Sequence, residues 1–160
     1  MKRTRLSRLG KPLQELVAAA DAATKTSYSP YSRFAVGAAL MTPDGEIVTG
    51  SNVENAAYGS TICAERAALV RANAMGYRVF KALAVAARAA GARRVAGGDV
   101  AAPCGACRQM LYEAASNAGR NIEVILLGAD GKTVVLTSVA ELLPLAFGGS
   151  KKRGGSNVDG

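Results

Sequence analysis

Residues 61–66 read Thr-Ile-Cys-Ala-Glu-Arg, and residues 103–109 read Pro-Cys-Gly-Ala-Cys-Arg-Gln. These two segments hold all three cysteines of the 160-residue chain, which contains no histidine. Three thiolates are one ligand short of a closed tetrahedral zinc shell, so the fourth position is left to water. Glu65 lies two residues after Cys63, where its carboxylate can handle the protons of that water. The pattern predicts a catalytic zinc site rather than a structural one.

The spacing of the cysteines fits a single ion. Cys104 and Cys107 stand at i and i+3, so both sulfurs project from one face of a helical turn. Helix N-termini carry a positive partial charge that favours thiolates, and Cys63 is also expected at a helix start. The alternative interpretations are three small buried hydrophobic residues or a structural zinc. A structural site requires a fourth protein ligand, and the sequence offers no candidate.

Hydrophobic periodicity and turn residues divide the chain into alternating helices and strands. An apolar stripe at i, i+3, i+4 and i+7 predicts a helix from Leu13 onward, and short apolar runs between turn residues predict strands. The pattern favours a mixed sheet with helices on both faces. The expected strands are 34–41, 46–49, 82–87, 122–127 and 133–136, and the further helices are 63–75, 103–118 and 139–143.

Length and charge set the domain organisation. The sequence suits one domain at residues 11–147, preceded by a flexible basic arm at 1–10 and followed by a disordered tail at 148–160. The net charge of +8 is concentrated in three places. They are the N-terminal end (Lys2, Arg3, Arg5, Arg8, Lys11), a central loop (Arg88, Arg93, Arg94) and the C-terminal end (Lys151, Lys152, Arg153).

The remaining composition excludes several classes of protein. No apolar run reaches the roughly 18 residues of a membrane span, and no secretory pattern is visible. Three cysteines in these motifs indicate metal ligands in a reducing compartment, which predicts a cytoplasmic protein without membrane contact. The basic clusters are not interleaved with aromatic residues, so we expect solvated charges rather than a nucleic-acid platform.

The two cysteine segments resemble the zinc signature of the nucleoside and nucleobase deaminases, a well-known signature with a Cys₃ variant and a glutamate that is not a ligand. Three flanking segments resemble one branch, the small homotetrameric cytidine deaminases, in the order found there. The resemblance extends from about Leu13 to Phe147. The flanking segments are 31–40 (YSRFAVGAAL), 50–58 (GSNVENAAY) and 141–144 (ELLP), the last leading to Phe147.

The resemblance implies a fold and an activity. The fold is α/β, a three-layer α/β/α sandwich with a mixed five-stranded sheet. The activity is zinc-dependent hydrolytic deamination of cytidine and 2′-deoxycytidine to the uridine products, with release of ammonia, in pyrimidine salvage. The implied cofactor is one Zn²⁺ per subunit, held by Cys63, Cys104 and Cys107, and the implied assembly is a homotetramer with composite active sites.

Glu65 carries the expected mechanism. Hydrolytic deamination needs water to attack C4, a proton at ring nitrogen N3 and a proton on the departing amine. One carboxylate beside the polarised water can perform all three transfers. A first-turn glutamate favoured by the helix dipole is the structural alternative. Arg66 adjoins the motif, and a guanidinium that donates to a ligand sulfur would restore acidity to the water, whereas an ordinary surface salt bridge is the alternative.

The resemblance also implies the residues that hold the nucleoside. Asn52 and Glu54 match positions that bind the ribose 3′-hydroxyl, although both residue types are also common in loops. Phe34 is expected to stack on the pyrimidine, with an ordinary core residue of the strand as the alternative. The backbone N–H of Ala64 is expected to bind O2 of the base. Phe147 is expected to reach the active site of a neighbouring subunit, with a lid on its own core as the alternative.

Two rival functions remain open at this point. A deaminase of a modified or antibiotic cytosine nucleoside shares the zinc segments, and the Asn52/Glu54 pair favours the plain nucleoside. A catalytically silent zinc protein that binds nucleic acid through its basic arms is the rival from another class. The presence of Glu65 argues against a protein without catalytic activity.

Overall fold

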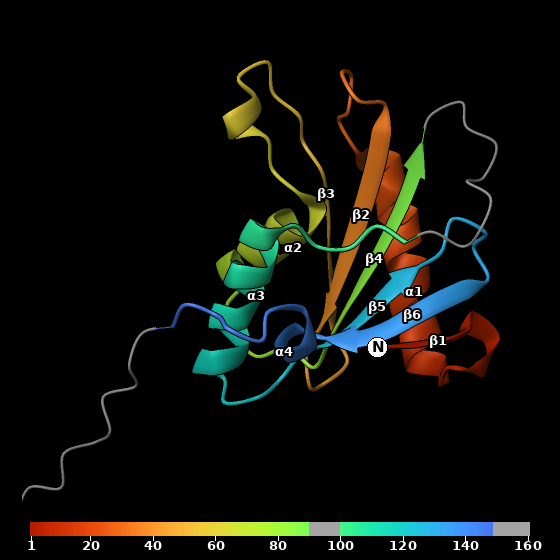
Figure 1. Ribbon diagram of the computed structural model, residues 1–160, viewed down its shortest axis with the longest axis vertical. Coiled ribbons are helices and arrows are strands. Elements are labelled where there is room, and N and C mark those ends of the chain that lie inside the picture. The colour runs from red at the N-terminus through yellow and green to blue at the C-terminus, as the bar shows by residue number, and fades with distance from the viewer. Residues whose placement is uncertain (90–99, 149–160) are drawn as a thin grey trace, which may run out of the picture.

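The computed structural model describes residues 1–89 and 100–148, which form a six-stranded sheet covered by helices on both faces (Figure 1). The strand order is β1-β6-β5-β4-β2-β3. The strands are β1 (Lys2–Arg5), β2 (Phe34–Met41), β3 (Ile47–Ser51), β4 (Ala82–Ala89), β5 (Glu123–Leu127) and β6 (Thr133–Ser138). The helices are α1 (Lys11–Ala23), α2 (Ala64–Ala74), α3 (Gly105–Asn117) and α4 (Val139–Leu142).

The sheet is mixed, as expected. β4 and β5 are parallel, with Ala82 opposite Glu123, and the chain between them passes through α3. The other neighbouring pairs are antiparallel. Two of them are connected by tight turns, β2–β3 and β5–β6, as the Asp-Gly pairs at 44–45 and 130–131 predict. The fold class is therefore confirmed.

The two faces of the sheet carry separate cores. On one face, α1 packs Leu16, Val17 and Ala20 against residues of β2, β4, β5 and β6. On the other face, α2, α3 and α4 pack against the sheet, with buried residues such as Ala68 and Leu111. Figure 1 shows α1 on one side of the strands and the other three helices on the opposite side. The layered arrangement brings the N-termini of α2 and α3 to the same face.

Two strand glycines allow the helices to approach the sheet closely. A Cβ at Gly37 would lie 2.7 Å from the backbone nitrogen of Thr24, next to the end of α1. A Cβ at Gly50 would lie 2.8 Å from the carbonyl oxygen of Ala64, the first residue of α2. These contacts involve backbone atoms, which cannot move aside. Gly50 therefore sets how closely the start of α2 lies to β3.

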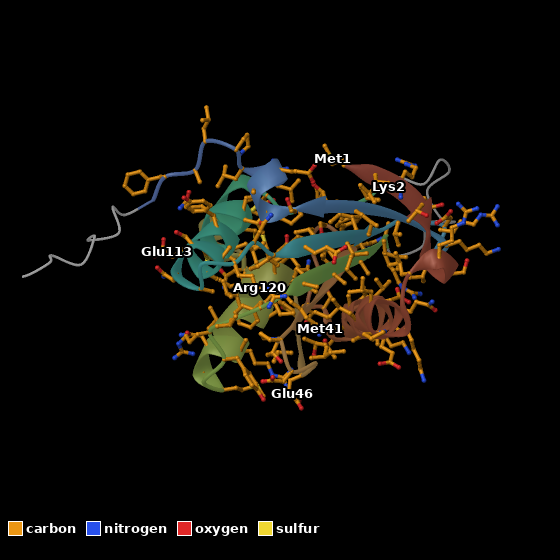
Figure 2. The ribbon with its side chains drawn as sticks, turned by 90° about the horizontal axis from the view of Figure 1, so that it is seen from below. Met1, Lys2, Met41, Glu46, Glu113 and Arg120 are labelled. Atoms are coloured by element: carbon orange, nitrogen blue, oxygen red, sulfur yellow. The ribbon has the colours of Figure 1, made fainter. Side chains whose placement is uncertain are left out.

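The N-terminal segment differs from expectation. Residues 1–10 are predicted as a flexible arm, but Lys2–Arg5 form β1 and supply the sixth strand of a sheet expected to have five. β1 pairs antiparallel with β6, and the Met1 ammonium contacts the Glu141 carboxylate at 2.9 Å. Figure 2 shows Met1 and Lys2 at this edge of the molecule. Backbone hydrogen bonds between strands do not depend on side-chain charge. A strand made of basic residues therefore has no apolar pattern from which it could be predicted.

The other expected elements are present with small changes of boundary. The central basic cluster is divided: Arg88 lies within β4 and is paired with Asp21 of α1 at 2.9 Å, while Arg93 and Arg94 lie outside the described residues. The tail at 149–160 also lies outside them. Among the helices of residues 1–89 and 100–148, none combines the length and apolarity that crossing a bilayer requires.

Candidate active site

The three cysteines meet at the N-termini of two helices. Cys63 is the N-cap residue of α2 and Cys104 the N-cap residue of α3, both with extended backbone, and Cys107 lies in the first turn of α3. Figure 1 shows these two helices side by side on one face of the sheet. Because helix N-termini present unpaired N–H groups and a positive partial charge, the sulfurs lie where thiolates are favoured.

The distances between the sulfurs fit one metal ion. The Sγ atoms of Cys104 and Cys107 are 3.5 Å apart, and those of Cys63 and Cys104 are 3.9 Å apart. All three sulfurs lie within 4.8 Å of one another. Tetrahedral zinc with Zn–S bonds near 2.3 Å requires sulfur separations of about 3.8 Å. The donor set and its spacing therefore suit zinc, with one position left for a non-protein ligand.

The Glu65 carboxylate lies next to this cluster and is largely shielded from water. Glu65 is the second residue of α2 and is only 4% exposed. Burial raises the pKa of Glu65, whereas its own backbone N–H, the Cys107 thiol and the Arg66 charge oppose that rise. A carboxyl group with a raised pKa takes up a proton more readily than a solvated one, as a proton shuttle must.

Asn52 and Glu54 lie just after β3 and are both buried, whereas Val53 between them is 45% exposed. The alternation places both polar side chains on the same side of an extended segment. Asn52 Nδ2 donates to the Phe34 carbonyl at 2.9 Å, and Glu54 Oε2 accepts from the Tyr31 backbone N–H at 2.9 Å. The pair is thus tied to the segment that leads into β2.

Comparison with known proteins agrees with this geometry. Residues 11–119 match the model of the cytidine and deoxycytidylate deaminase zinc-binding region. The chain is similar to the cytidine deaminase of Sporosarcina psychrophila, with 43% identity over 84% of this chain and 90% of that protein. The chain belongs to the cytidine and deoxycytidylate deaminase family.

Solved structures of the family share the fold. The crystal structure of cytidine deaminase from Burkholderia pseudomallei superposes with a TM-score of 0.71 at 46% identity, covering 84% of this chain and 98% of that one. A more distant relative, the blasticidin-S deaminase of Bacillus cereus, is 33% identical over 70% of this chain and 76% of its own length. The zinc-binding character of the family accords with the three-cysteine cluster.

Two arginines flank the cluster of this deaminase-family chain. Arg66 donates from Nη2 to the Thr61 carbonyl at 2.6 Å, and its Nε is buried without a hydrogen-bond partner among the described residues. Arg108 donates to the carbonyls of Pro103 and Leu142. Arg108 therefore ties α3 to two backbone carbonyls. The Nε–H of Arg66, in contrast, has no acceptor within the described part of the chain and is free to donate a hydrogen bond to an anionic group.

The other expected site residues differ in their exposure to solvent. Ala64 is the first residue of α2, so its N–H is one of those without an acceptor in the helix. Phe34 is 40% exposed at the start of β2, on the same face of the sheet as Val36. Phe147 is 85% exposed, and Gln109 of α3 donates to its carbonyl at 2.6 Å. The aromatic ring of Phe147 therefore projects away from its own core.

Two cavities among the described residues have walls that do not include the cysteine cluster. One, of about 520 Å³, lies between α1, the end of β4 and the turn after β5, and Phe34 contributes to its wall. The other, of about 510 Å³, lies beside β1 and includes Arg108. Neither is lined by Cys63, Cys104, Cys107 or Glu65. Cys104 is exposed, so the metal cluster opens toward the surface of the chain.

Two serines that the sequence patterns did not single out contact the side chains of Asn52 and Glu54. The Ser27 hydroxyl donates to Asn52 Oδ1 at 2.6 Å, and the Ser32 hydroxyl donates to Glu54 Oε1. A signal existed in the serine-rich segment 27–32, which closely precedes Phe34. Its contacts were not predictable, because serines in such a segment also serve as ordinary turn residues.

Proposed function

We propose that this protein is a zinc-dependent hydrolase that converts cytidine and 2′-deoxycytidine, with water, to uridine and 2′-deoxyuridine and ammonia, in pyrimidine salvage. The observation that carries the proposal is the buried carboxylate of Glu65 beside a cluster of three sulfurs spaced for one metal ion. The names of the relatives agree with it.

Cys63, Cys104 and Cys107 would hold the zinc ion. When bound, zinc polarises a water molecule and lowers its pKa, which supplies a nucleophile near neutral pH. The chain contributes two helix N-termini directed at the sulfurs and a poorly solvated carboxylate next to them. Both features are properties of the protein itself.

Glu65 would move the protons of the reaction. It takes a proton from the attacking water as the new C4–O bond forms and delivers it to ring nitrogen N3. It then passes a proton from the added hydroxyl group to the amino nitrogen, and the C4–N bond breaks to release ammonia. The raised pKa of Glu65 suits a group that must both accept and donate. No external oxidant or reductant is needed, since water is the only co-reactant.

The proposed substrate contacts come from the resemblance of the flanking and cysteine segments to the family. Asn52 and Glu54 would bind the ribose 3′-hydroxyl, which cytidine and 2′-deoxycytidine share. The N–H of Ala64 at the start of α2 would donate to O2 of the base, and Phe34 would lie against the pyrimidine face. Buried polar groups of this type reject analogues that leave them unpaired.

The assembly would be a homotetramer in which Phe147 covers the active site of a neighbouring subunit. Two features support this arrangement: the exposed ring of Phe147 and the open position of the cysteine cluster on the single chain. Figure 1 shows the chain after α4 passing over α3 and away from the sheet. Three unpaired cysteines are suited to a reducing compartment, which supports a cytoplasmic location.

Arg66 would compensate for the charge of three thiolates, which leave zinc with a net charge of about −1. Its buried Nε, which has no partner among the described residues, is the group available for this role. Hydrogen bonds to ligand atoms withdraw charge from the metal site and thereby change the acidity of the bound water.

A deaminase of an antibiotic cytosine nucleoside is the alternative, favoured by the similarity to the blasticidin-S enzyme. A panel of substrates separates the two. The purified zinc-loaded protein is incubated with cytidine, 2′-deoxycytidine, blasticidin S and a cytidine-containing oligonucleotide, and ammonia is measured. We expect ammonia from the first two alone. Release from blasticidin S but not cytidine would reverse the order of the proposals, and release from the oligonucleotide would indicate a polynucleotide deaminase.

A further inference from the structure

The side-chain amide of Asn52 is held in one orientation. Its Oδ1 accepts from the Val36 backbone N–H at 2.8 Å and from the Ser27 hydroxyl at 2.6 Å, while its Nδ2 donates to the Phe34 carbonyl at 2.9 Å. A backbone N–H only donates and a carbonyl only accepts. Turning the amide over would therefore break the bonds to both backbone groups, and the assignment of oxygen and nitrogen is fixed by chemistry.

This arrangement leaves Asn52 with a single polarity toward a ligand. Both acceptor sites of its Oδ1 are occupied by the protein, and one of its two Nδ2 hydrogens is used. The remaining group is the second Nδ2 hydrogen. Toward a ligand, Asn52 is therefore a hydrogen-bond donor.

Glu54 has the opposite polarity. Its Oε2 accepts from the backbone N–H groups of Tyr31 at 2.9 Å and Ser32 at 3.2 Å, and its Oε1 accepts from the Ser32 hydroxyl. The Ser32 hydroxyl is the largest cause that lowers the pKa of Glu54, so the group is an ionised carboxylate at neutral pH. A carboxylate has about four acceptor positions, of which three are used. Toward a ligand, Glu54 is an acceptor.

The two side chains are fixed relative to each other through the same segment. The Tyr28 backbone N–H donates to the Asn52 carbonyl at 3.0 Å, and the Glu54 backbone N–H donates to the Tyr28 carbonyl at 2.8 Å. Ser27 and Ser32 lie on either side of this backbone pairing in the sequence, and each contacts one of the polar side chains. A rigid donor and a rigid acceptor consequently stand two residues apart on one side of the chain.

We propose that Ser27 and Ser32 are positioning residues that hold the Asn52 and Glu54 side chains in place, so that the pair offers one donor and one acceptor to a single sugar hydroxyl. The hydroxyl accepts from Asn52 Nδ2 and donates to Glu54. This inference rests on the proposed function and adds to it the direction of each hydrogen bond between the protein and the sugar hydroxyl. An alcohol fulfils both requirements, whereas a group that can only accept faces the carboxylate without a hydrogen to offer.

The test compares how strongly the protein discriminates between cytidine and 3′-deoxycytidine, as the ratio of their kcat/KM values. Ser27→Ala and Ser32→Ala are the test variants, and Ser27→Thr retains the hydroxyl. Ser51→Ala is the matched control, because the Ser51 hydroxyl contacts Thr26 at 3.1 Å and has no hydrogen bond to Asn52 or Glu54 among the described residues. Melting temperature and zinc content are measured for each variant.

We expect the discrimination ratio to fall about tenfold in Ser27→Ala and Ser32→Ala, since one hydrogen bond of net worth near 1.4 kcal/mol corresponds to that factor. The fall should come from cytidine, through a higher KM, while 3′-deoxycytidine is processed as before. Ser27→Thr should restore the ratio, and Ser51→Ala should not change it. An unchanged ratio in both test variants, or an equal loss for both substrates, would overturn the inference.

A second measurement needs no variant and so does not depend on their folding. In 3′-fluoro-3′-deoxycytidine the fluorine has nearly the size of a hydroxyl but cannot donate, and it would face the Glu54 carboxylate. We expect the parent protein to process this analogue no better than 3′-deoxycytidine. Turnover near that of cytidine would contradict the fixed polarity. A parent protein that does not deaminate cytidine at all would overturn the proposed function, and the inference with it.

Discussion

At the scale of single residues, Glu65 is held where a carboxylate is costly for stability. Burying a charge without compensation is strongly unfavourable, and the groups that compensate Glu65 are the start of α2, the Cys107 thiol and Arg66. A residue kept for stability would more readily be an exposed first-turn glutamate. The position of Glu65 is therefore better explained by chemistry at the neighbouring sulfurs.

Replacing Arg66 with glutamine tests whether the guanidinium tunes the metal site. Loss of a group that donates to a metal ligand typically lowers activity or metal affinity about 10- to 100-fold. We expect kcat for cytidine to fall about tenfold while zinc remains at one ion per chain, measured by ammonia release and metal analysis.

Arg71→Gln provides the control, since Arg71 contacts Thr49 on the exposed surface rather than the cysteine segment. Full turnover in Arg66→Gln would show that its hydrogen bond to Thr61 is merely structural. Loss of zinc together with turnover would assign Arg66 to metal retention instead of tuning.

The sequence pattern pointed to the cysteine cluster and Glu65 but not to Ser27 or Ser32, for a physical reason. Cys63, Glu65, Cys104 and Cys107 lie in two short segments whose spacing already satisfies metal geometry. Ser27 and Ser32 act through Asn52 and Glu54, which lie 25 and 22 residues further along the chain. Contacts of that kind are created by the fold and leave no local pattern.

At the scale of elements, the approach of α2 to β3 positions the active site. Gly50 lies opposite the start of α2, where the Ala64 carbonyl leaves no room for a side chain. The same helix start provides Cys63, the Ala64 N–H and Glu65. The contact between Gly50 and the start of α2 thus determines both how α2 packs on β3 and where these three groups lie.

Gly50→Ala is expected to be strongly destabilising and to disturb the metal site. The added methyl group meets backbone atoms of α2, and overpacking of this type costs about 1–3 kcal/mol. Gly59→Ala is the matched control, because a Cβ there meets nothing within 4 Å. Urea unfolding and zinc content check the prediction, and an equal stability of the two variants would contradict it.

Most helices and strands were predictable because the spacing of their apolar residues shows which face is buried, and that spacing differs between helix and strand. β1 was not, since its sequence Lys-Arg-Thr-Arg lacks an apolar alternation. Its place is determined by backbone pairing to β6 and by the Met1–Glu141 contact. Charged side chains on an edge strand also protect a sheet from pairing with other chains. Lys2–Arg5 of the basic arm therefore form an edge strand of the fold.

At the scale of the whole molecule, the proposed tetramer explains why an aromatic residue near the end of the domain is left in solvent. Phe147 is held by its backbone to α3 while its ring is exposed. In the proposed tetramer, the exposed ring of Phe147 covers the open metal cluster of a neighbouring subunit. We therefore expect that a single subunit does not form a complete site.

Mixing two defective subunits tests this arrangement. Glu65→Gln removes the proton shuttle, and Phe147→Ala removes the cover for the neighbouring site. In tetramers reassembled from equal amounts, about a quarter of the sites would combine an intact Glu65 with an intact Phe147 from the neighbour. We expect cytidine turnover after reassembly to exceed that of the same mixture before it. Strict additivity of the two activities would indicate that Phe147 serves its own subunit.

The most direct test of the central claim is ammonia release from cytidine by the zinc-loaded protein and by its Glu65→Gln variant. We expect turnover by the parent and a loss of about 10⁴-fold in the variant, at the upper end for general acid–base catalysis because one group makes every transfer. Zinc should remain at one ion per chain in both proteins. A variant that retains most of its activity, or a zinc-loaded parent that releases no ammonia from cytidine, would contradict the account.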